Sequence, residues 1–152
     1  MMPNTAHAYY NTDQIVNGTF SHGDDGWYDS NKAIGFDSAL VGRHEVYDSI
    51  SQNFSVPAGA TATISFDSSV WTDFNCEIYG LCFSNWRGGT FHVRIVEQGT
   101  GTKLFDWGCN VGNAYSDCPG NLVADVSSLA GHNVSITFAV TGDNGYRVTA
   151  LV

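Results

Sequence analysis

The sequence predicts an all-β protein folded as a two-sheet antiparallel β-sandwich, and three observations support this prediction. Segments that alternate apolar and polar residues recur about every ten residues. Gly, Asn, Asp and Pro separate these segments, as expected for tight turns between strands. Gly is frequent, with 17 residues, and aromatic residues make up 13% of the chain, whereas Lys and Arg total 6. Since good formers of exposed helix are scarce, we expect strands and no helix.

The predicted strands follow one another along the whole chain after a short polar extension. They cover residues 14–20, 33–37 (the weakest), 47–56, 61–71, 90–98, 102–107, 121–125, 133–141 and 146–152. Pro57-Ala58-Gly59 and Gly99-Thr100-Gly101 supply the fixed and the positive φ angles that turns between such strands need. The 152 residues fit one core, so we expect a single domain over 14–152 behind an extension over 1–13.

Antiparallel alternation gives the predicted sandwich two different ends. Loops 72–89, 109–120 and 142–145 should all leave at one end, and short turns should close the other. The first two of these loops are long and contain the four cysteines, Cys76, Cys82, Cys109 and Cys118. Long loops with many aromatic residues are frequent places of function.

The cysteines predict disulfide bonds, because their number is even and they show neither a CxxC motif nor zinc-ligand spacing with His. Pairs within each loop, Cys76–Cys82 and Cys109–Cys118, are preferred, although bonds between the two loops remain open. Disulfides indicate an oxidising compartment and therefore secretion. Ala6-His7-Ala8 has the form of a signal-peptidase site, so the extension is read as a cleavage remnant, with a chance match as the alternative.

The charge restricts the partners. The net charge is −9 and the pI is about 4.6, so phosphate backbones and anionic lipid surfaces are disfavoured. No apolar run approaches the roughly 18 residues that a membrane helix requires. We therefore expect neither nucleic acid binding nor membrane insertion, whereas neutral glycans and divalent cations are compatible with the charge.

Three segments resemble the galactose-binding-like jelly rolls, a family that includes xylan- and β-glucan-binding modules. These segments are Ile15-Val16-Asn17-Gly18-Thr19-Phe20 followed by Gly26-Trp27, then Gln52 to Gly59, and then Ala124 to Val134. The resemblance implies a jelly-roll sandwich, a core position for Trp27 and a non-catalytic module that binds carbohydrate. The family's acidic residue after the Phe is replaced here by Ser21, and its final acidic strand would be expected where the sequence reads Ala150-Leu151-Val152. The family's structural calcium ion is therefore left as an open expectation.

Aromatic and polar side chains in and beside the cysteine loops are the candidate ligand-binding residues. A flat ring can stack on the apolar face of a sugar while Asn, Asp or Arg bind the hydroxyls. The candidates are Trp71, Asp73, Tyr79, Asn85, Trp86, Arg87, Trp107 and Tyr115. The alternative is that the rings form a satellite core under the loops.

Three acidic residues near the N-terminus, Asp24, Asp25 and Asp29, could supply oxygen ligands to calcium, although they lack the spacing of an EF-hand and a solvated turn is the alternative. The five histidines show no paired spacing for zinc. Because no nucleophile, acid and base set can be named, we expect no enzyme.

The predicted function is therefore a secreted, non-catalytic, lectin-like module that binds a polysaccharide through the aromatic loops or the concave sheet face. The alternative is a structural subunit of an extracellular filament, sheath or adhesive layer that self-associates through edge strands.

Overall fold

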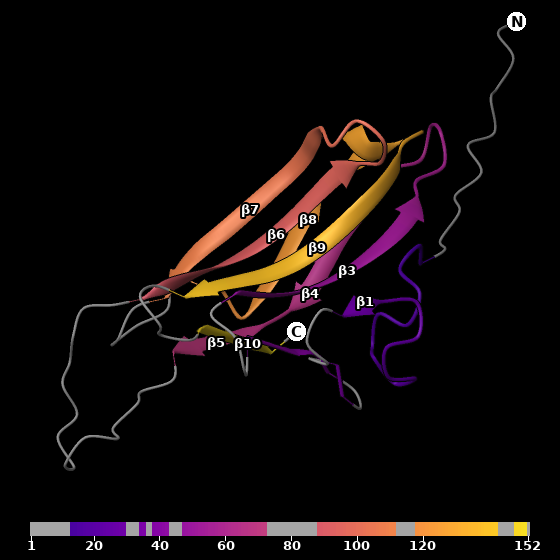
Figure 1. Ribbon diagram of the computed structural model, residues 1–152. Coiled ribbons are helices and arrows are strands. Elements are labelled where there is room, and N and C mark those ends of the chain that lie inside the picture. Colours follow the sequence, from indigo (N-terminus) through magenta and orange to yellow (C-terminus); the bar gives the residue numbers. More distant parts are fainter. Residues whose placement is uncertain are drawn as a thin grey trace, which may run out of the picture.

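Figure 1 shows the computed structural model, which describes residues 13–29, 34–35, 38–42, 47–72, 88–111, 118–142 and 148–151. Within these residues the chain is almost entirely β-structure. The strands are β1 (Tyr28–Asp29), β2 (Leu40–Val41), β3 (Tyr47–Ser55), β4 (Thr63–Asp67), β5 (Ser69–Thr72), β6 (Gly89–Glu97), β7 (Lys103–Val111), β8 (Asn121–Asp125), β9 (Asn133–Gly142) and β10 (Val148–Leu151). A single 3-10 turn, Ser127–Leu129, is the helical element of the described part.

The strands form two layers, which confirms the predicted sandwich. One layer is a five-stranded sheet in the order β1-β3-β9-β6-β7, and all of its pairs are antiparallel. The second layer lies behind it in Figure 1 and contains the ladders β4-β8 and β2-β10-β5. The long central strands β3, β6 and β9 therefore set the position of most residues on the front sheet.

The core follows directly from the alternation in these strands. Val134, Ile136, Phe138 and Val140 of β9 are buried, whereas the residues between them are only partly buried. Strands β3 and β6 repeat the pattern, and Phe91 and Phe138 also contact Phe66 from the second layer. Burial of each such side chain contributes roughly 1.5–3 kcal/mol. Because successive side chains of a strand point to opposite faces, the side chains between these buried ones lie on the outer surface of the front sheet.

The two ends of the sandwich differ as predicted. Gly89 pairs with both Val111 and Gly142, so the segments 73–88, 112–117 and 143–147 all begin or end there, at what we call the cysteine-loop end. At the opposite turn end, Val56 N–H donates to His132 O at 3.0 Å and Gln98 N–H donates to Asn133 O at 2.9 Å. Short turns with backbone hydrogen bonds thus close the far end (Figure 1).

The strand predicted over 14–20 is wrong, because this segment forms successive turns. Asn17 and Phe20 have positive φ angles of 51° and 55°, which no strand residue adopts. The side chain of Asn17 donates to Gly23 O at 2.8 Å and accepts from His22 N at 3.1 Å. The buried Gln52 holds the segment from β3 by bonds to both backbone groups of Val16. The two side-chain amides replace the hydrogen bonds that a ladder would provide.

Two other predicted boundaries also change. The strand predicted over 61–71 is divided into β4 and β5 at Ser68, where the pairing partner changes from β8 to β10. The strand predicted over 102–107 continues to Val111, so Cys109 lies in β7 and not in a loop. A register shift at Ile95 and Val96, opposite the start of β7, marks a bulge near the turn end. The paired strands on the cysteine-loop side of this bulge remain in regular register.

Candidate functional site

The outer face of the five-stranded sheet carries regular rows of side chains across four strands. The inward positions of these strands are apolar except for Asp48 and Gln52 of β3, and the outward positions of β3, β9, β6 and β7 carry mostly small, polar, charged and aromatic residues. The registers place these residues in transverse rows about 7 Å apart, since neighbours on one face are two residues apart along a strand. Row one contains Tyr47, Thr141, Thr90 and Asn110; row two contains Ser49, Ala139, His92 and Gly108; row three contains Ser51, Thr137, Arg94 and Asp106.

Row two is made of small side chains and one imidazole. The ring of His92 lies over Gly108, because a Cβ built on Gly108 would come within 2.5 Å of His92 Nδ1 and 2.7 Å of Cε1. On its other side His92 faces Ala139, so no bulky neighbour stands beside the ring across either strand. The Nδ1 atom is covered and has no hydrogen-bond partner among the described residues. The imidazole of His92 is therefore a flat group among small side chains, and a row with polar side chains lies on either side of it.

Row three carries the charged groups of this face. Arg94 Nε donates to Asp106 Oδ1 at 3.4 Å, and Lys103 Nζ donates to Asp106 Oδ2 at 2.6 Å. The hydrogen bond from Lys103 lowers the pKa of the Asp106 carboxyl; burial opposes this effect, and the charge of Arg94 adds to it. At neutral pH the row therefore presents an ionised carboxylate and a guanidinium side by side, and both can hydrogen-bond to hydroxyl groups.

Two exposed tyrosines border the rows on the side of β3. Tyr47 is 59% exposed and belongs to row one, and Tyr28 is 73% exposed and lies opposite Ser51 of row three. Their positions along β3 differ by four residues, about 13 Å. At this exposure both rings are free to contact a ligand on the outer face.

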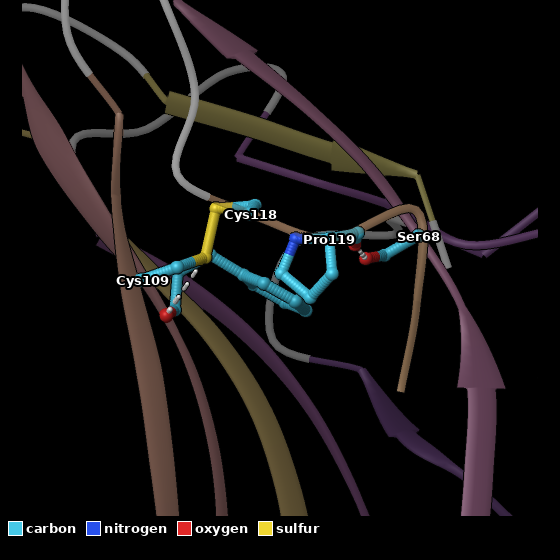
Figure 2. The surroundings of a disulfide bond; sticks show 5 residues. Ser68, Cys109, Cys118 and Pro119 are labelled. Carbon is cyan, nitrogen blue, oxygen red and sulfur yellow. Dashed lines mark hydrogen bonds between the residues drawn. A yellow bond between two sulfur atoms is a disulfide. The ribbon is translucent and has the colours of Figure 1, made fainter. Parts of the chain in front are cut away.

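A disulfide bond fixes the cysteine-loop end beside row one (Figure 2). Cys109 of β7 is bonded to Cys118, with a Cα–Cα distance of 5.1 Å, which confirms the predicted local pair. Ser68 Oγ donates to Pro119 O at 3.3 Å, and Ser68 N–H donates to Gly120 O at 2.9 Å. The bond thus joins the edge of the front sheet to the corner of the second layer where β8 begins.

The structure describes few of the loop residues proposed from the sequence. Trp107 lies on the inner side of β7 and contacts Phe66 and Phe91, with ring centroids 6.0 Å apart in both pairs, so its position agrees with the satellite-core alternative. Trp71 pairs with Thr149 in the second layer. The remaining candidates lie outside the described residues, as does the pair Cys76–Cys82; they are Asp73, Tyr79, Asn85, Trp86, Arg87 and Tyr115.

Trp27 occupies the core position that the resemblance implied. It is 9% exposed and its ring packs against Phe20 and Phe138. Its Nε1–H donates to Asn17 O at 3.2 Å, which satisfies the one polar group of the indole. The neighbouring Tyr28 points the other way, to the outer face.

Several oxygen atoms of the N-terminal turns, where calcium is expected from the sequence, accept hydrogen bonds within the chain. Asn17 Nδ2 donates to the carbonyl oxygens of Gly23 and Asp25, at 2.8 and 3.4 Å, so these oxygens face an amide and not a cation. Asp29 Oδ2 accepts the Ile34 N–H at 2.9 Å. In the described ranges no three His, Cys, Asp or Glu residues are grouped closely enough to hold a metal ion. The calcium site at Asp24, Asp25 and Asp29 stays a prediction, and we derive no role from such an ion.

The sequence reasoning missed His92 and Gly108. The two residues are 16 positions apart in the sequence, and only the register of β6 and β7 makes them neighbours. Gly108 gave no signal of its own, because the strand was predicted to end at residue 107 and only the structure extends it to Val111.

Comparisons with known proteins give likenesses of fold. Neither a protein-family model nor a curated protein matches the chain. A solved structure titled as TmCBM61 in complex with beta-1,4-galactotriose is 14% identical, with a TM-score of 0.49 over 91% of this chain and 94% of the other. The enzymatically active domain of bacteriophage CBA120 tailspike protein 4 is also 14% identical, with a TM-score of 0.46 over 91% of this chain and 21% of the other. No helix in the described ranges is both long and apolar enough to span a membrane.

Proposed function

We propose that this protein is a non-catalytic carbohydrate-binding module that holds a neutral glycan across rows one to three of the outer face. The observation that carries the proposal is the flat His92 ring in a row of small residues, between rows that offer hydroxyl, amide, guanidinium and carboxylate groups. A sugar presents an apolar ring face and a periphery of hydroxyls, so it needs a flat surface with polar groups around it. Rows one to three supply both.

Electrostatics favours a neutral glycan. The net charge of −9 disfavours strongly acidic polysaccharides, which would approach through a repulsive field. Arg94 is already paired with Asp106, and this pairing orients its guanidinium for a hydrogen bond to a hydroxyl. When the glycan displaces water, neither charge is left without a partner. Tyr28 and Tyr47 would extend the contact along the β3 side.

The aromatic loops are proposed as a second contact, since row one lies at the cysteine-loop end from which they depart. Trp86 and Tyr79 lead this part of the proposal, on sequence grounds. Secretion is proposed on the support of the Cys109–Cys118 disulfide, because such bonds persist in oxidising compartments.

Calorimetric titration of the full chain with soluble β-glucan, xylan, mannan and galactan tests the proposal. We expect at least one of these glycans to bind, and we expect His92→Ala and Tyr47→Ala each to weaken that binding roughly two- to twelvefold, the loss of one stacking contact of about 0.5–1.5 kcal/mol. Val123→Ala is the matched control, because Val123 is 69% exposed on β8 of the second layer and should leave affinity unchanged.

Each outcome has a separate meaning. Failure of the wild type to bind any of the four glycans would reject the carbohydrate-binding function. Normal binding by both His92→Ala and Tyr47→Ala would reject the outer face as its place, and a loss confined to Trp86→Ala would then assign it to the loops. The predicted alternative, a self-associating structural subunit, is tested on the same sample by size-exclusion chromatography at high concentration, where a strict monomer would rule it out.

A further inference from the structure

One hydrogen of the Gly108 Cα, the one that takes the place of a Cβ, points at the ring of His92. A Cβ built in that direction would come within 2.5 Å of Nδ1, 2.7 Å of Cε1 and 3.3 Å of Cγ. A hydrogen lies closer to Cα than a methyl carbon does, so it fits at this position and places a Cα–H group against Nδ1. Nε2 and Cδ2 are the more distant ring atoms, so this side of the imidazole points away from Gly108.

The two ring nitrogens of His92 therefore have different surroundings. Nδ1 is covered and has no hydrogen-bond partner among the described residues, whereas Nε2 is not covered and reaches the solvent. The neighbours of His92 across the two adjacent strands are Gly108 and Ala139, and neither has a polar side chain. Nδ1 thus faces a Cα–H group, and Nε2 faces the side from which a ligand would approach.

These surroundings distinguish the two neutral forms of the imidazole, each of which has one N–H donor and one acceptor nitrogen. A Cα–H group is a weak hydrogen-bond donor, so it is attracted to the lone pair of an unprotonated nitrogen. A hydrogen on Nδ1 would instead meet the hydrogen of Gly108, and it would be a covered N–H without an acceptor, which is costly and rare in folded proteins. The form with the hydrogen on Nε2 avoids both penalties, because water or a ligand accepts from Nε2.

We propose that Gly108 fixes His92 in the Nε2–H form, so that the imidazole donates a hydrogen bond to the ligand from the centre of the outer face. The ligand itself rests on the proposed glycan function, within which His92 is a specificity-determining donor and Gly108 a positioning residue. Arg94, the next outward residue of β6, can also only donate. Two neighbouring positions of β6 therefore require acceptor oxygens from the glycan, which ring and glycosidic oxygens supply as well as hydroxyl groups do.

His132 provides a contrast within the same protein. Its Nδ1 lies 2.8 Å from Oε1 of Glu97. A carboxylate only accepts hydrogen bonds, and such a bond sets which ring nitrogen carries the hydrogen, so in His132 this is Nδ1. The neutral rings of His92 and His132 should therefore have opposite tautomers, and a single spectrum reports both.

Long-range proton–nitrogen correlation NMR of the full chain tests the tautomer, because protonated and unprotonated ring nitrogens have well-separated chemical shifts. The spectra are recorded at a pH high enough for the ring signals to stop changing with pH, and His92→Gln identifies the signals of His92. We expect a protonated Nε2 and an unprotonated Nδ1 in His92, and the reverse in His132. Gly108→Ala should move the His92 shifts toward the averaged values of an exposed imidazole and leave those of His132 unchanged, which also shows that the fold persists.

Calorimetry with the glycan that binds among β-glucan, xylan, mannan and galactan tests the donor role separately. His92→Gln keeps an N–H donor near the place of Nε2, whereas His92→Leu keeps a side chain of similar size without a donor. We expect His92→Leu to bind roughly two- to twelvefold more weakly than His92→Gln, which corresponds to the loss of one neutral hydrogen bond.

An Nδ1–H form of His92 in the wild type would overturn the proposal, as would identical ring shifts in the wild type and Gly108→Ala. Equal affinities of His92→Gln and His92→Leu would overturn the donor role, since the ring would then contribute stacking alone. Failure of all four glycans to bind would reject the proposed function and the donor role toward a glycan with it. The tautomer is decided in every case by the spectra of the free protein, so the two failures are distinguishable.

Discussion

Removal of the Cys109–Cys118 disulfide by the double substitution Cys109→Ala and Cys118→Ala should lower the free energy of unfolding by about 2.5–3 kcal/mol. The two residues are 9 positions apart, and closing a loop of about ten residues restricts the unfolded chain by roughly 2.7 kcal/mol at 25 °C in the loop-entropy model. Lost burial of the Cys109 sulfur adds a smaller amount in the same direction, because this residue is only 8% exposed.

Urea unfolding followed by tryptophan fluorescence measures this difference, and thermal unfolding should show a fall of about 5–10 °C in Tm. Reductant applied to the double variant is the control, since it reports any contribution from Cys76 and Cys82. A change below about 1 kcal/mol with an unaltered m-value would refute the reasoning, because it would mean that the bond does not restrict the unfolded chain as the loop-entropy model requires.

Three further predictions concern the outer face, the N-terminal turns and the turn end. Gly108→Ala should displace the His92 ring and lower the free energy of unfolding by less than about 1.5 kcal/mol. The displaced ring should also weaken glycan binding, and an unchanged affinity by calorimetry would contradict this. Asn17→Ala should lower stability by about 1–3 kcal/mol, while calcium or EDTA should leave the Tm of the wild type unchanged; a calcium-induced rise would contradict the amide's role. The hydrogen bond from His132, and then that from Thr100, lowers the pKa of Glu97. The charged carboxylate therefore stabilises the fold at pH values above the usual pKa of 4.5. This contribution is lost as the pH falls through the lowered pKa. The Tm difference between wild type and Glu97→Gln should therefore shrink from pH 7 to pH 3, and a constant difference would disprove the link.

The sequence allowed correct prediction of the features that depend on local patterns. Strict alternation located β9 within one residue of its observed end, and antiparallel succession placed the long loops together at one end. A short separation was sufficient to prefer the pair Cys109–Cys118. In each case the determining interactions lie within or next to the segment concerned.

The errors arose where distant residues decide the outcome. The apolar pair Ile15 and Val16 suggested a strand, but Gln52 captures the backbone of Val16, and the turn signal Asn17-Gly18 carried more information than the apolar pair. The division at Ser68 depends on where β8 and β10 reach the same strand. The sequence did not predict the candidate site on the outer face for the same reason. His92 and Gly108 become neighbours only through the register between β6 and β7, which composition and residue spacing do not reveal.

The bulge at Ile95 and Val96 has a consequence for how the hairpin between β6 and β7 can vary. It separates the turn over 98–102 from the regularly paired stretch that contains rows one to three. Insertions or deletions in the turn can be absorbed at the bulge, since an extra residue there alters the local twist and leaves the pairing beyond it intact. The hairpin tip is therefore a suitable place to graft a tag or a peptide while His92 stays opposite Gly108.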